Sequence, residues 1–204
     1  MKKTIITILS LSTLFLTSCG DILSGGDQLN DSEGLKTIKS LLENQFGAET
    51  EVYSLDLSST DHLTSEFGLA TISYLDKGVD YSRSYMTYLG PGKELQEAEA
   101  ASESFQKEFF LKKKQGKIKL NEFDFDQILV KFNEATAMIS SEYDTFTLYS
   151  WDYEVNNDGG ISADFTIEGT KKGEGTSLEG RNIVTNYYEF QFEMNEDGEV
   201  VPKD

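Results

Sequence analysis

The side chains of this sequence that could do chemistry are mainly carboxylates, and one histidine accompanies them. Among 204 residues there are 36 Asp and Glu residues and a single histidine, His62, which follows Asp61 in the polar stretch 58–62. A histidine with a carboxylate and serines nearby has the residue types of a hydrolytic triad. The sequence contains no Gly-x-Ser-x-Gly nucleophile motif, however. We therefore predict a structural or solvated histidine, whereas a catalytic role predicts that His62→Ala abolishes a hydrolytic activity.

Two carboxylate pairs have a spacing that general acid–base chemistry or calcium binding would use. Asp152 and Glu154 share one face of a predicted strand, because strand side chains alternate between faces, and Asp124 and Asp126 are two residues apart. Neither these pairs nor the oxygen-rich stretch 156–160 has the spacing of a calcium-binding loop. We predict a solvated acidic face and a hairpin loop, with a glycosidase pair or a calcium site as the alternative.

An aromatic stripe is the feature that most suggests ligand binding. Tyr149, Trp151 and Tyr153 alternate along one predicted strand. Tyrosine and tryptophan combine an apolar face with a polar tip, which suits sugar stacking, protein contacts and ordinary sheet packing. We predict ordinary sheet packing under the helices, with these three residues as the candidate ligand contacts in the alternative. Ready quenching of Trp151 by acrylamide would favour binding.

Lysines gather in one part of this otherwise acidic chain. They are Lys112, Lys113, Lys114, Lys117 and Lys119. Such a cluster can contact anionic lipid. It also suits the C-terminus of a helix, where cations complement the helix dipole, and we predict that simpler role.

Composition excludes several classes of function. The formal net charge is −18, and without its first eighteen residues, which hold two lysines and no acid, the chain has 16 basic and 36 acidic residues and a charge of −20. Such a charge repels nucleic acid, so no nucleic-acid partner is expected. One cysteine, Cys19, and one histidine leave no internal disulfide and no usual zinc or iron ligand set, so we predict no metal and no cofactor.

The first half of the chain has the pattern of one helix and three strands. Apolar residues at helical spacing predict a helix over 32–46, which Gly47 ends. Strand patterns follow over 53–57, 67–75 and 81–89, and the turn Asp76-Lys77-Gly78 predicts a hairpin between the last two. Gly90-Pro91-Gly92 ends this block.

The second half repeats this order after a connecting region. Residues 94–114 have a helical composition, and 118–123 look extended. A further helix begins near Asp124 or Asp126, and strand patterns return over 149–155, 161–167 and 184–194.

These elements predict an α+β fold in which helices pack on one face of an antiparallel sheet. We predict two tandem helix-plus-three-strand modules, 32–92 and 124–204, joined by a helix and extended segment over 93–123. Modules of this shape resemble the peptidase-inhibitory and β-lactamase-inhibitor-like exported domains, by analogy of fold alone.

The amino terminus has the pattern of an export signal. Two lysines precede an apolar run over 5–16, which is too short to span a bilayer. Leu16-Thr17-Ser18-Cys19 resembles the lipobox of bacterial lipoproteins. That resemblance implies a signal peptide over 1–18, cleavage before Cys19 by signal peptidase II, and a diacylglycerol on the Cys19 sulfur. The polar stretch 19–31 would then be a flexible tether.

Localisation and function follow from this signal. In lipoproteins of two-membrane bacteria an acidic residue just after the cysteine favours the inner membrane, and here Gly20 holds that position, so we expect the outer membrane, on its periplasmic or surface side. We predict a non-enzymatic envelope lipoprotein that binds a protein, peptide or glycan. The alternatives are a carboxylate-dependent hydrolase and a structural subunit of an envelope complex.

Overall fold

The structure, a computed structural model, describes residues 26–88, 94–114, 116–174, 177–179 and 182–203. The predicted signal peptide, Cys19 and the Gly90-Pro91-Gly92 boundary lie outside the described residues. Within them, no helix is both long enough and apolar enough to cross a membrane.

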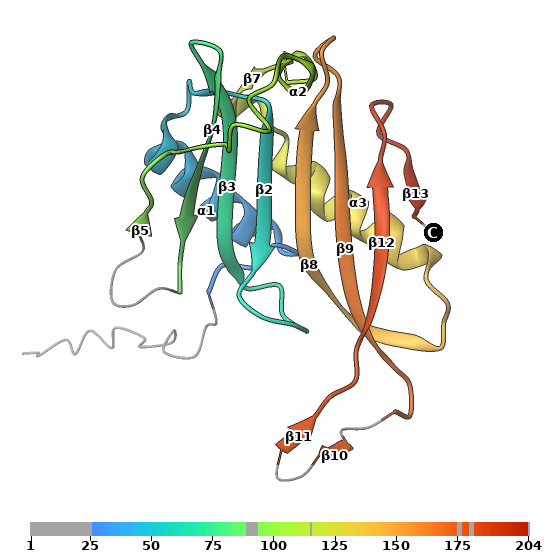
Figure 1. Ribbon diagram of the computed structural model, residues 1–204. Helices are drawn as coiled ribbons and strands as arrows, with labels where there is room; N and C mark the ends of the chain where they lie inside the picture. The colour runs from blue at the N-terminus through green and yellow to red at the C-terminus, as the bar shows by residue number, and fades with distance from the viewer. Residues whose placement is uncertain (1–25, 89–93, 115, 175–176, 180–181, 204) are drawn as a thin grey trace, which may run out of the picture.

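One large antiparallel sheet forms the centre of the molecule. Its strand order is β13-β12-β9-β8-β2-β3-β4-β5, and β6 also pairs with β4. Helices α1 and α3 lie side by side behind the sheet in Figure 1, and the face toward the viewer carries no long helix in the described part of the chain. We call this second face the open face. The predicted α+β class with an antiparallel sheet is confirmed, and the two longer helices, α1 and α3, lie on one side of that sheet.

The first half begins with the expected helix. Helix α1 covers Ser32–Leu42, and the Asp31 side chain caps it by accepting hydrogen bonds from the backbone N–H groups of Glu33 and Gly34. A π-helical turn over Glu43–Gly47 follows. The strands of this half are β1 Glu51–Val52, β2 Ser54–Ser59, β3 Phe67–Asp76 and β4 Val79–Met86. The predicted hairpin joins β3 to β4, with Gly78 at a φ of 80°.

The predicted helix over 94–114 is wrong. This region holds two short strands, β5 Glu94–Leu95 and β6 Glu99–Ala100, and one short helix, α2 Glu108–Lys112. The two strands pair with β4. Because β4 would otherwise offer unpaired backbone groups at the sheet edge, these pairings outweigh the helical propensity of the segment.

The second half starts with β7 Ile118–Lys119, which pairs with β1, and a 3₁₀ turn over Leu120–Glu122. Helix α3 covers Phe125–Met138 and is capped by the Asp124 carboxylate. Its strands are β8 Tyr143–Val155, β9 Ile161–Lys171, β10 Ser177–Glu179, β11 Asn182–Val184, β12 Tyr188–Met194 and β13 Val200–Pro202. The predicted strand over 184–194 is therefore divided: β10 and β11 form a separate hairpin, and β12 belongs to the main sheet.

The two halves meet where β2 pairs with β8 in antiparallel register. From this seam each half adds its strands outward, β3 and β4 on one side and β9 and β12 on the other. One apolar core therefore lies between the helices and the whole sheet. Duplication of a helix-plus-three-strand module stays a prediction, since both halves share this sheet and core.

The end of the predicted tether is packed against the fold. Leu29 is fully buried, its N–H donates to the Ser65 carbonyl, and Gln28 forms a β-bridge with Glu66. The chain therefore joins the sheet at the end where β2 turns into β3.

Candidate functional site

Four carboxylates form a row across the open face. Strand register places Asp56 of β2 opposite Asp152 of β8, Asp152 opposite Asp164 of β9, and Asp164 opposite Glu193 of β12. We call these four residues the acidic row. Directly opposed like charges destabilise a sheet, so this arrangement has an energetic cost at neutral pH.

The two inner carboxylates of the row are held partly out of water. Burial, together with the charges of Asp152 and Glu154, raises the pKa of Asp56 to about 7. Burial and the charge of Asp164 raise the pKa of Asp152 to about 6. Neither carboxylate has a hydrogen-bond donor within the described part of the chain. Both groups are thus poised to lose protons when a cation approaches.

A depression of about 420 Å³ lies over the acidic row. All four carboxylates line it, together with Glu154, and a lysine stands at each side. Lys203, just after β13, places its Nζ 2.7 Å from an Asp164 carboxylate oxygen. Lys114 comes from the segment after α2. The site is thus a concave acidic surface that already accepts one ammonium group.

One end of the open face is covered by the β2–β3 loop, and His62 holds this loop in place. His62 Nδ1 lies 2.5 Å from Glu168 Oε1, and the Leu63 N–H donates to Glu168 Oε2 at 2.5 Å. Glu168, on β9, is fully buried. The hydrogen bond with Glu168 raises the pKa of His62. The imidazole ring is stacked between Tyr149 and Tyr187, with centroids 5.0 and 4.4 Å away.

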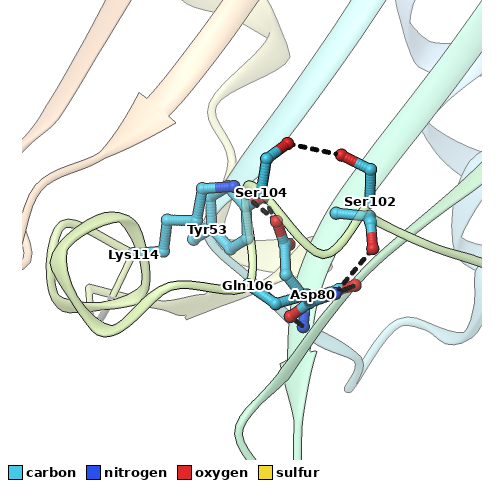
Figure 2. A network of polar contacts seen from close by, with 7 residues as sticks. Tyr53, Asp80, Ser102, Ser104, Gln106 and Lys114 are labelled. Atoms are coloured by element: carbon cyan, nitrogen blue, oxygen red, sulfur yellow. Dashed lines mark hydrogen bonds and ion pairs between the residues drawn. The ribbon is translucent and has the colours of Figure 1, made fainter.

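The opposite end is covered by residues 101–114, and Figure 2 shows the polar network that attaches them to the sheet. The Gln106 amide accepts a hydrogen bond from the Asp80 N–H and donates to the carbonyls of Asp80 and Ala101. The buried Asp80 carboxylate accepts from the Tyr53 hydroxyl at 2.7 Å and contacts Lys114 Nζ at 2.5 Å. These contacts leave the acidic row exposed between two covered ends.

The predicted aromatic stripe is divided by the structure. Trp151 is fully buried and Tyr153 is 3% exposed, both among core residues on the helix side. Tyr149 is on the other side, because it is an extra residue with no partner in β9: Leu148 pairs with Ile167 and Ser150 with Thr166. The buried pair therefore serves sheet packing, and Tyr149 contacts His62 on the open face.

The lysine cluster is largely neutralised within the molecule. Lys112 pairs with Glu108, Lys117 with Glu51, and Lys119 with Glu49. Lys114 pairs with Asp80, and Lys113 lies over the Phe109 ring. The two predicted carboxylate pairs lie in different parts of the fold. Asp124 caps α3, whereas Asp152 and Glu154 lie on the open face. Residues 156–160 form the predicted hairpin loop between β8 and β9.

Several residues of this surface were not among the candidate residues that the sequence pointed to. Asp56, Asp164, Glu168 and Glu193 lie on three strands far apart along the chain. Alternation identifies them as polar-face residues of predicted strands, but their cross-strand partners depend on the strand order.

Comparisons with known proteins provide little further information. No protein-family model matches the chain, and no curated protein is significantly similar in sequence. Among solved structures, the chain is similar to a candidate lipoprotein from Clostridium difficile 630, with 14% sequence identity, a TM-score of 0.42, and coverage of 81% of this chain and 88% of that protein. At this level the likeness carries no argument about function.

Proposed function

We propose that this chain is a lipid-anchored binding protein of the bacterial envelope whose open sheet face holds a cationic segment of a protein or peptide. The observation that carries the proposal is the acidic row, four carboxylates in direct cross-strand register on an open face. A row of Thr or Ser would make a more stable sheet, because it avoids like-charge contacts. Local costs of this kind concentrate at functional sites.

Lys203 indicates the chemistry of the ligand. Its ammonium group lies 2.7 Å from Asp164, whereas Asp56 and Asp152 have no cation paired with them within the described ranges. A lysine or arginine side chain from a partner would form an ion pair with Asp56 or Asp152, as Lys203 does with Asp164. The depression of about 420 Å³ has room for such side chains, and its polar lining favours them over a hydrophobic ligand.

The membrane anchor is part of the same proposal and depends on the sequence Leu16-Thr17-Ser18-Cys19. An acylated Cys19 would lie seven residues before Gly26, the first described residue. We therefore expect Cys19→Ser to abolish labelling of the protein by radioactive palmitate. Undiminished labelling would contradict the anchor and leave the binding surface to be tested separately. The outer membrane remains our expected location, because Gly20 follows the cysteine.

The binding test uses a fluorescent hexalysine peptide and the detergent-solubilised full chain. We expect saturable binding that weakens as salt increases, because salt screens the attraction between the peptide cations and the carboxylates. The double variant Asp56→Asn/Asp152→Asn should lower the affinity at least about tenfold, the equivalent of about 1.4 kcal/mol. Binding should also strengthen from pH 6 to pH 8, because ionised Asp56 and Asp152 are the binding forms. Burial and the nearby charges of Glu154 and Asp164 raise the pKa values of these two aspartates to about 7 and about 6.

The matched control is Asp126→Asn/Asp197→Asn, which removes two exposed carboxylates, one in the first turn of α3 and one in the turn before β13. It removes the same number of carboxylates. Equal loss of binding in both double variants would mean that peptide affinity follows net charge, and the proposed site would be wrong.

A further inference from the structure

We propose that His62, Glu168 and Glu189 form a binding site for one divalent metal ion such as Zn²⁺, at the end of the open face that the β2–β3 loop covers. One ring nitrogen of His62 and one carboxylate oxygen from each glutamate lie within 4.8 Å of one another. This site is separate from the acidic row and does not depend on the proposed peptide ligand.

Strand pairing brings the two glutamates together. Glu168 of β9 and Glu189 of β12 are direct cross-strand partners. Glu168 is fully buried, and Glu189 is exposed. Within the described residues, neither glutamate forms an ion pair with a lysine or arginine. Two neighbouring carboxylates with one imidazole beside them leave net negative charge at this point, which a dication would neutralise.

The histidine ring is already oriented. It is stacked between Tyr149 and Tyr187 at interplanar angles of 10° and 22°, and Glu168 contacts Nδ1 while the Tyr187 hydroxyl lies 3.1 Å from Nε2. If His62 and Glu168 bind the same ion, Nδ1 and the Glu168 oxygen would both be ligands, with the metal in place of the proton between them. The Tyr187 hydroxyl beside Nε2 would then be the outer partner that orients the zinc-bound imidazole. Since the ring is packed on both faces, little side-chain entropy remains to be lost on binding.

The donor set suits Zn²⁺ better than calcium or magnesium. One imidazole nitrogen and two carboxylates are zinc ligands, whereas hard cations prefer oxygen alone. Donors bound to one Zn²⁺ at about 2.1 Å lie at most about 4.2 Å apart, so the three groups must approach by about half an ångström. The His62 side chain is 42% exposed, which leaves an entry path and room for a water ligand.

The chain makes a clean test possible, because His62 is its single histidine and Cys19 its single cysteine. We would titrate ZnCl₂ into the metal-free, detergent-solubilised Cys19→Ser full chain by calorimetry and follow the ring nitrogens of His62 by ¹⁵N NMR. We expect one zinc ion per chain and a large shift of one ring nitrogen. His62→Gln and Glu189→Gln should each lower the affinity at least about tenfold.

The matched control is Glu43→Gln, which removes one carboxylate at the end of α1 on the helix side and should leave zinc affinity unchanged. Glu189 is exposed, so Glu189→Gln keeps the test valid if the His62 variant is poorly folded. An unshifted His62 ring in the presence of excess zinc would overturn the proposal. Zinc binding that His62→Gln leaves intact would also overturn it, because the ion would then lie elsewhere on the acidic surface.

Discussion

Asp56 and Asp152 face each other directly across the β2–β8 seam, on the side of the sheet that no long helix covers in the described part of the chain. The seam is where the two halves of the fold join, so this like-charge contact lies at the centre of the sheet. Burial and mutual repulsion raise the pKa of Asp56 to about 7, far above its ordinary value of 3.8. The fold therefore prefers these groups uncharged, whereas a cationic ligand would prefer them charged.

Removing these charges should stabilise the protein. Because the folded pKa of Asp56 is raised, its neutral form is favoured by folding, and the resulting stability is present below about pH 4 and lost as the pH rises toward 7. We expect Asp56→Asn to raise the free energy of unfolding by about 1–3 kcal/mol at pH 8 and the Tm by about 2–10 °C. Asp152→Asn should also raise the free energy of unfolding, by an amount that grows as the pH rises from about 4 to about 6.

The measurement is thermal unfolding of each variant and the wild type from pH 4 to pH 8. Asp197→Asn, in an exposed turn, is the control. Glu154 and Asp164, which face the pair, remain in every variant. If a variant differs from the wild type in Tm by the same amount at pH 4 and at pH 8, the loss of a charge is not the cause.

The contact between His62 and Glu168 should hold the β2–β3 loop on the sheet. In Glu168→Ala the half-buried Leu63 N–H and the His62 ring lose their carboxylate partner. A buried donor left without an acceptor costs about 1–3 kcal/mol. We expect faster amide exchange over residues 60–66, measured by mass spectrometry. Exchange as slow as in the wild type would show that Ser65 and the stacked tyrosines suffice to hold the loop.

Gln106 should anchor the segment that crosses the far end of the open face. Gln106→Ala removes three hydrogen bonds to Asp80 and Ala101. We expect a stability loss of about 1–2 kcal/mol and faster proteolysis within residues 101–114. Gln106→Glu should cost more, because it places a second carboxylate oxygen against two carbonyl oxygens. Gln127→Ala, on the exposed side of α3, provides the comparison. Equal protease resistance in all three variants would contradict an anchoring role.

Trp151 should report on the core and not on a ligand. Its indole is fully buried and stacked on Phe165 at 4.5 Å, so acrylamide should quench its fluorescence weakly. Its Nε1 has no hydrogen-bond partner within the described residues, so Trp151→Phe loses no hydrogen bond. We expect Trp151→Ala to cost about 3–5 kcal/mol and Trp151→Phe much less. Strong quenching in the folded wild type would contradict this packing.

Sequence reasoning worked best where one segment carries its own signal. Helix α1 has an apolar stripe and a glycine at its end, and the structure has both. The hairpin between β3 and β4 has its turn residues, and it was predicted correctly. Residues 94–114 failed for the opposite reason: their helical composition is a weak local preference, and pairing with β4 outweighed it.

The aromatic stripe shows how a single residue changes an expected surface. Strict alternation places Tyr149, Trp151 and Tyr153 on one face. The bulge at Tyr149 shifts the register by one residue, so Trp151 and Tyr153 enter the core while Tyr149 stays on the open face with His62. Nothing in the local sequence marks this bulge, because it depends on how β8 pairs with β9.

By itself, the sequence determined the acidic charge, where helices α1 and α3 begin and which strand residues are polar, because each depends on composition or on neighbours along the chain. The export signal with Cys19 stays a prediction from the sequence. The tertiary structure alone decided which polar residues meet. Asp56 and Asp152, like Glu168 and Glu189, become partners through the strand order and register. Those pairings come from burying one apolar face of the long strands β2, β3, β8, β9 and β12 under the same two helices, which is a property of the whole fold.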